Sequence, residues 1–223
     1  MVHGRIVETW RIPVVVKRAA ALAAGLVVVA GLVGGCAQKP GVAATLTPVS
    51  CGKKADVPPV HRVASDGTVS WTCGDGPAVR GKSTTVSAAE VADVLTMAAG
   101  GGLSAADAIE GLAKMGTVLR VADEIGVTVS DADAEQWLDD YGYEKNDGTM
   151  VVAKYSILGT RANAGPDAAD ALTEEQLLAI DDGVTAALTS LDIVVNPRFG
   201  TFDPERITVV APTWVPQSAF LSL

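Results

Sequence analysis

Residues 87–142, SAAEVADVLTMAAGGGLSAADAIEGLAKMGTVLRVADEIGVTVSDADAEQWLDDYG, decide the predicted fold, because they contain three successive helix patterns with start and stop signals. Ser87 and Glu90 have the spacing of a capping box, and the apolar residues after them recur at the offsets of one helical face. Ser104 and Ser130 open the next two helices, and glycines follow the end of each pattern. The stretch therefore predicts a helical domain.

Two further segments extend the helical pattern downstream. Residues 150–158 are compatible with a strand or a helix, and we favour a helix that packs on the others. Thr173-Glu-Glu-Gln176 repeats the capping-box spacing, and apolar residues follow on one face as far as Leu191. We expect the short segment Ile193–Val195 to pair with an extended piece near residues 78–86. The predicted fold is mainly α, with a helical domain over residues 81–204 and an irregular tail over residues 205–223.

Upstream of the helices the pattern changes to β-structure and then to a linker. Residues 51–80 contain an Asp66-Gly67 pair between two short β-rich runs, which is a hairpin signal. Residues 36–50 are small, contain proline and show no clear periodicity. We interpret them as a flexible tether.

Residues 1–35 have the layout of a secretory signal peptide. Four basic residues and a single acid lie within residues 1–18, and residues 19–33 form an uncharged apolar stretch before Gly34 and Gly35. The apolar stretch is shorter than the roughly 20 residues that a membrane-spanning helix needs. Plain secretion and a retained N-terminal anchor are the alternatives, and each places the rest of the chain outside, because the basic flank stays in the cytoplasm.

The sequence Val33-Gly-Gly-Cys36 resembles the lipobox of bacterial lipoproteins, whose cysteine carries a diacylglyceryl thioether. The resemblance implies that Cys36 is the lipidation site and that the lipid bilayer is a partner of the chain. The expected location is the extracytoplasmic face of the cell membrane. Cys51 and Cys73 then lie in an oxidising compartment, where an even pair of cysteines indicates a structural disulfide.

The composition of residues 36–223 excludes several classes of function. Removal of residues 1–35 takes away four basic residues and one acid, so the formal net charge moves from −9 to −12. Such a charge disfavours nucleic acid and anionic membrane surfaces as partners. His61 is the single histidine that remains, so we expect neither an enzyme active site nor a bound cofactor.

Acidic residues, methionines and one arginine are the remaining candidates for a site. The acids at 131, 133, 139, 140, 181 and 182 lack the ligand pattern of a calcium-binding loop, so we predict a solvated acidic face and no metal site. Met97, Met115 and Met150 are candidates for an apolar binding groove, although methionine commonly fills cores. Arg198 is predicted to anchor the tail through an ion pair with an acid.

Two phrases of the sequence resemble the SurA-like lipoproteins of actinobacteria. The first is Glu124-Ile-Gly-Val-Thr-Val-Ser130-Asp131, which resembles the helix–Gly–Val–cap junction of SurA-type N-terminal domains, and the second is Asn196-Pro-Arg-Phe-Gly200. The resemblance implies a chaperone-like domain that binds extended or partly unfolded polypeptides, with the last helix packed on the first ones. The parvulin isomerase module of some relatives is absent, because the 30 residues from 143 to 172 cannot hold such a domain.

Three classes of function follow from these observations. The favoured class is a membrane-anchored, non-catalytic lipoprotein that binds polypeptides; the client-binding residues are not specified by the sequence. The second is a structural or scaffolding lipoprotein of the cell envelope. The third is a lipoprotein that binds a small ligand.

Overall fold

The structure is a computed structural model that describes residues 41–52, 58–64, 68–74, 76–98, 101–165 and 168–212. It is a mixed α/β fold in which five helices account for 47% of the described residues and small antiparallel sheets make up the rest of the regular structure there. The prediction of a mainly α fold is therefore confirmed for the helical region alone. Cys36 and residues 1–35 lie outside the described residues.

The central strand of the main sheet is β1 (Val42–Ser50), in the segment that the sequence predicted to be a tether. β6 (Thr84–Ser87) and β5 (Val79–Arg80) pair with one edge of β1, and β7 (Leu191–Val195) pairs with the other, all antiparallel. The prediction of a flexible tether is wrong for residues 42–50. Ala43 and Ala44 are fully buried, and small residues are what a strand between two others can accommodate under a helix.

The same arrangement corrects the predicted partner of the segment around Ile193. β7 pairs with β1, with Leu46 opposite Ile193, and does not pair with residues 78–86. β1 lies between the two strands that we expected to meet. The pairing of β7 with β1 was not predicted, because residues 42–50 were not recognised as a strand.

The five helices begin, with the exception of the fourth, where their capping residues predicted. They are α1 (Ala88–Met97), α2 (Ala105–Glu124), α3 (Asp131–Tyr141), α4 (Asp147–Asn163) and α5 (Glu174–Thr189). The side chains of Ser87, Ser104, Ser130 and Thr173 each accept a hydrogen bond from the backbone N–H three residues later. Residues 150–158 are part of α4, as favoured, and Asn146 caps this helix.

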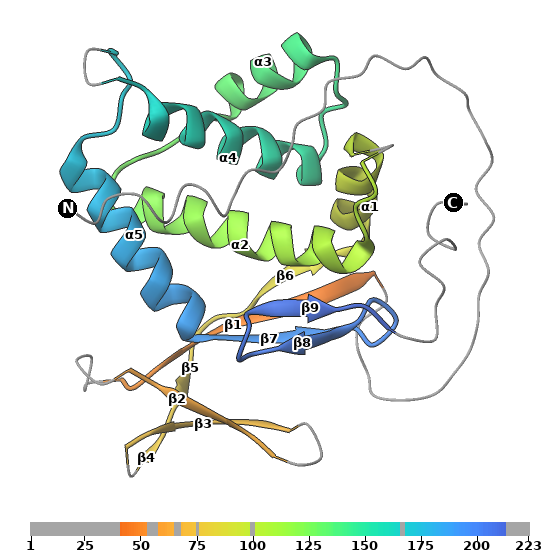
Figure 1. Cartoon of the computed structure of the whole chain (residues 1–223), viewed down its shortest axis with the longest axis vertical. Coiled ribbons are helices and arrows are strands. Elements are labelled where there is room, and N and C mark those ends of the chain that lie inside the picture. Colours follow the sequence, from red (N-terminus) through yellow and green to blue (C-terminus); the bar gives the residue numbers. More distant parts are fainter. Residues whose placement is uncertain are drawn as a thin grey trace. The chain divides into compact units, whose positions relative to one another are not determined.

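The main buried cluster joins the sheet to α1 and α2. Ile109 and Leu112 of α2 are buried together with Leu46 of β1 and Ile193 of β7, so α2 lies on the sheet (Figure 1). α5 packs on α2, and α4 packs on α1, α2 and α3. The return of the last helix to an early one is what the SurA-like resemblance implied.

The N-terminal β region forms a second, smaller sheet closed by a disulfide. β2 (Val60–Val63), β3 (Val69–Cys73) and β4 (Gly76–Pro77) are antiparallel, which confirms the predicted hairpin. The disulfide Cys51–Cys73 is present. It connects the residue after β1 to the end of β3, so it attaches the hairpin to the main sheet.

The C-terminal part of the described chain is a hairpin of β8 (Thr201–Asp203) and β9 (Thr208–Val210). The prediction of an irregular tail from residue 205 is therefore wrong for residues 208–210. The Glu110 carboxylate of α2 accepts hydrogen bonds from the Thr208 hydroxyl at 2.6 Å and the Val209 N–H at 3.0 Å. This carboxylate fixes β9 against α2, a contact between residues about a hundred positions apart.

Candidate functional site

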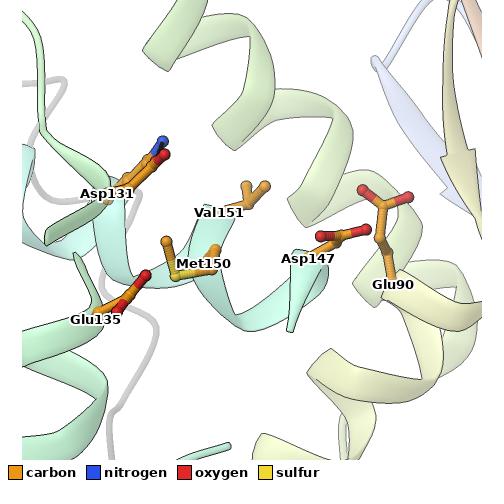
Figure 2. A pocket seen from close by; sticks show the side chains of 7 residues that line it. Glu90, Asp131, Glu135, Asp147, Met150 and Val151 are labelled. Atoms are coloured by element: carbon orange, nitrogen blue, oxygen red, sulfur yellow. Dashed lines mark ion pairs between the residues drawn. The ribbon is translucent and has the colours of Figure 1, made fainter. Parts of the chain in front are cut away.

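An open hollow lies where α1, α3 and α4 meet. Its volume is about 360 Å³, which falls within the usual range of ligand pockets. The lining residues are Glu90, Asp131, Glu135, Asp147, Met150, Val151 and Lys154. In Figure 2, Met150 and Val151 lie between Asp131 and Glu135 on one side and Asp147 and Glu90 on the other.

Helix starts bring three of the carboxylates to the hollow. Glu90, Asp131 and Asp147 each lie in the first turn of a different helix. Carboxylates are favoured there because the helix dipole places partial positive charge at the N-terminus. The close approach of α4 to α1 depends on Gly148, where an added Cβ would lie 2.5 Å from the Glu90 carbonyl oxygen.

One cation already lies in the hollow. The Lys154 ammonium is 2.5 Å from an Asp131 carboxylate oxygen. Glu135 is 3.7 Å from the Lys145 ammonium, which is closer to Asp139 at 2.8 Å. The hydrogen bond to Asp139 raises the pKa of Lys145 above its ordinary value. The Asp131 side of the hollow is therefore largely neutralised.

The opposite side of the hollow keeps its negative charge. One Glu90 oxygen accepts a hydrogen bond from the Ser87 N–H at 2.7 Å. Within the described ranges, neither Glu90 nor Asp147 forms an ion pair with a basic side chain. Two carboxylates beside an apolar floor thus face solvent without a cation.

The three methionines that the sequence suggested for a groove are not brought together. Met115 is buried in the interior with 3% of its surface exposed. Met97 and Met150 are half-buried and pack against the cluster of Ala134, Leu138 and Ala153. Of the three, Met150 alone lines the hollow. Because Met150 also packs on the core, its side chain is held in place as part of the hollow floor.

The other described residues that the sequence suggested for a site lie outside the hollow. Arg198 does not form the predicted ion pair within the described part of the chain; its guanidinium carbon lies 4.4 Å from the centre of the Phe199 ring. No group of three potential metal ligands occurs among the described residues. His61 contacts the Trp71 ring at 5.3 Å between ring centres. The lipidation site Cys36 lies in the part that the structure does not describe.

Sequence reasoning missed Glu90 and Asp147 as neighbours. It singled out Asp131 and Met150 for other reasons. Glu90 was recognised only as part of a capping box, and Asp147 was not predicted to begin a helix. Their positions in the sequence are 57 residues apart, and nothing in the local patterns indicates that the starts of α1 and α4 meet.

None of the helices in the described ranges is sufficiently long and apolar to cross a membrane. Comparisons of the chain with models of protein families, with curated proteins and with solved structures find no match.

Proposed function

We propose that the chain is a non-catalytic lipoprotein, anchored through Cys36 on the extracytoplasmic face of the cell membrane, that binds extended segments of exported polypeptides. The proposal includes a SurA-N-like organisation of residues 81–204 without an isomerase module. Its location is supported by the signal-peptide layout of residues 1–35 and by the disulfide Cys51–Cys73, a bond that persists in oxidising compartments.

The hollow between α1, α3 and α4 is the observation that carries the binding function. Its apolar floor at Met150 and Val151 lies beside the acidic side formed by Glu90 and Asp147. An unfolded segment offers aliphatic and basic side chains in close succession, which fit such a surface. The ion pair between Lys154 and Asp131 is an example of how a basic side chain binds there.

The preferred clients are therefore segments in which Lys or Arg adjoins apolar residues. Glu90 and Asp147 would receive the basic side chain, because no described cation is paired with them. Met150 would contact the neighbouring apolar side chain, since an unbranched thioether adapts to different shapes. Binding of this kind is weakened by salt, since ion pairs at an open surface are screened.

The shape and the charge of the hollow also bear on the two alternative functions, a lipoprotein that binds a small ligand and a structural lipoprotein. A small-ligand lipoprotein would need an enclosed pocket, whereas this hollow is open to solvent. A purely structural lipoprotein would leave the carboxylates of Glu90 and Asp147 without a binding role, so the two proposals differ in one measurable property, which is affinity for unfolded chains.

A pair of synthetic unstructured peptides tests the proposal. One alternates leucine with lysine and the other alternates leucine with glutamate, at equal length. We expect the lipidated chain in phosphatidylcholine vesicles to bind the lysine peptide and not the glutamate peptide, as measured by fluorescence anisotropy of labelled peptide. The double substitution Glu90→Gln and Asp147→Asn removes the charges of the two carboxylates proposed to bind the basic side chain and should weaken binding.

The matched control is Asp181→Asn with Asp182→Asn, which removes two charges from α5, away from the hollow. If both double variants lower the affinity equally, net charge alone attracts the peptide and the hollow is not the site. If neither peptide binds and the chain leaves the aggregation of an unfolded exported protein unchanged, the polypeptide-binding function is wrong and the scaffolding alternative gains support.

A further inference from the structure

Three points of the chain meet at one end of the main sheet, which we call the NPRF end. β1 begins there, β7 continues there into the turn Asn196–Phe199, and β9 finishes there opposite Thr201. The Asn196 N–H donates to the Ala43 carbonyl at 2.8 Å, and its side-chain amide donates to the Val42 carbonyl at 3.1 Å. The turn is therefore fixed to the first residues of β1.

The chain between this end and the lipid anchor is short, because most of the segment predicted to be a tether forms β1. Because β1 starts at Val42 and the Gly41 carbonyl accepts a hydrogen bond from the Ala88 N–H at 2.7 Å, only residues 37–40 separate Cys36 from the fixed part. Five Cα–Cα steps span at most about 18 Å even when fully extended. If Cys36 is lipidated, as the proposed function holds, the NPRF end stays within that distance of the bilayer.

The charge of the NPRF end differs from that of the rest of the acidic domain. Arg198 and Pro197 are exposed, and no carboxylate in the described part of the chain forms an ion pair with Arg198. The guanidinium lies over the Phe199 ring, and Phe199 packs against the main core. A cation held in place by stacking keeps its hydrogen-bond donors available for another ligand.

The composition of the chain beyond β9 agrees with this difference. Residues 207–223 contain no Asp, Glu, Lys, Arg or His, and they include Trp214, Phe220, Leu221 and Leu223. Tryptophan and other amphipathic or apolar side chains are favoured at the boundary between lipid headgroups and acyl chains. The chain enters this stretch from β9, next to Gly200 and Thr201.

We propose that the NPRF end is the surface of this domain that contacts the phospholipid bilayer, with the Arg198 guanidinium bound to lipid phosphate. Arginine binds phosphate oxygens through two parallel hydrogen bonds, so it is suited to this ligand. The acidic remainder of the domain is repelled by anionic headgroups, which favours the orientation in which this end faces the lipid. The proposal rests on the proposed lipidation, and it adds which face of the domain is turned to the membrane.

Quenching by brominated lipids tests the orientation in the intact lipidated chain. Vesicles contain phosphatidylcholine and phosphatidylglycerol with brominated acyl chains, and Trp214→Phe provides the background. A tryptophan is then introduced as Pro197→Trp in the NPRF turn or, as the matched control, as Arg206→Trp at the opposite turn of the β8–β9 hairpin. We expect the tryptophan at 197 to be quenched and the tryptophan at 206 to be quenched little.

The charge reversal Arg198→Glu tests the phosphate contact. Added to the Pro197→Trp variant, it should lower the ratio of membrane-contacting to detached domain by at least about five-fold, the factor expected for the loss of one basic residue at an anionic surface. Arg206→Glu should leave the ratio unchanged. Circular dichroism verifies the folding of each variant. The native Trp214, measured as the difference between the parent and Trp214→Phe, gives a second probe that leaves the described fold unaltered.

The outcomes separate this proposal from the one on which it rests. A mass measurement of the N-terminal peptide first shows whether Cys36 carries lipid; an unmodified Cys36 contradicts the proposed anchorage. With Cys36 lipidated, equal quenching at 197 and 206, or no effect of Arg198→Glu, overturns the proposed orientation and leaves the anchorage intact.

Discussion

The contact between α5 and α2 gives the sharpest test of the fold, through the substitution Gly183→Ala. An ideal Cβ at Gly183 would lie 2.6 Å from Cγ1 of Val121. Carbon atoms pack at about 3.5–4.0 Å, so the two helices or the valine must move by roughly 1 Å. Val121 is buried with 4% of its surface exposed, and a β-branched side chain in a helix has little rotamer freedom. A change of the Val121 rotamer therefore does not readily relieve the contact with the added methyl group.

The expected magnitude follows from two opposing effects. Gly→Ala in a helix interior ordinarily stabilises a protein by about 1 kcal/mol, whereas overpacking costs about 1–3 kcal/mol. Gly116 of α2 provides the matched control, because an added Cβ there meets nothing within 4 Å. The difference in unfolding free energy between Gly183→Ala and Gly116→Ala removes the helix-propensity contribution, and we expect it to be about 1–3 kcal/mol.

Thermal and denaturant unfolding followed by circular dichroism measures this difference. A change of 1 kcal/mol corresponds to roughly 2–4 °C in Tm for a chain of this size. Val121→Ala should destabilise the parent, since a buried side chain is truncated, yet it should relieve the clash in the Gly183→Ala background. We expect a favourable coupling energy of about 0.5–3 kcal/mol in the double-mutant cycle. If Gly183→Ala stabilises the protein as much as Gly116→Ala does, α5 does not pack on α2 as described.

Three further predictions concern the disulfide, the β8–β9 hairpin and the start of α4. Replacement of Cys51 and Cys73 by alanine should lower the unfolding free energy by about 3 kcal/mol, because the bond closes a loop over a separation of 22 residues. The circular dichroism of the helices at low temperature should stay native-like. Its loss would show that the helices depend on the hairpin. Burial raises the pKa of Glu110, but hydrogen bonds from Lys114, Thr208 and the Val209 N–H outweigh burial and lower the pKa below its ordinary value of 4.5. The stabilisation is therefore present above that value and lost as the pH falls through the lower folded pKa, so the Tm of the parent and of Glu110→Gln should converge in acid; a constant Tm difference at all pH values would contradict this role. Gly148→Ala should destabilise the protein by about 1–3 kcal/mol, because the added Cβ would lie 2.5 Å from the rigid Glu90 carbonyl oxygen. A Tm equal to or above that of Gly116→Ala would refute the close approach of α4 to α1.

Helix starts were predicted well from the sequence because their signals are local. A Ser or Thr three residues before an acid, Thr or Gln satisfies free backbone N–H groups within one turn, and no distant residue is needed. The side chains of Ser87, Ser104 and Thr173 all accept the expected hydrogen bonds. The hairpin around Asp66-Gly67 was predictable for the same reason, since its turn and its flanking strands are adjacent in the sequence.

β1 was not predictable from the same kind of signal. Its residues, VAATLTPVS, include two adjacent buried alanines at an irregularity in the register with β6, so the alternation expected of a strand is broken. The two partners with the longest pairings lie far away, with β6 about forty and β7 about one hundred and fifty residues downstream. A strand defined by such distant partners looks like a linker when it is examined alone.

The sequence by itself determined the helices, the paired cysteines and the signal-peptide layout, because each depends on neighbours within a few residues or on residue type. Only the tertiary structure decided that the expected tether is the central strand. It also decided that an open acidic hollow lies where α1, α3 and α4 meet, and that the Asn196–Phe199 turn lies beside the first residues of β1. These features arise from contacts between segments that are distant along the chain. Such contacts are set by how the core packs as a whole, and no local pattern records them.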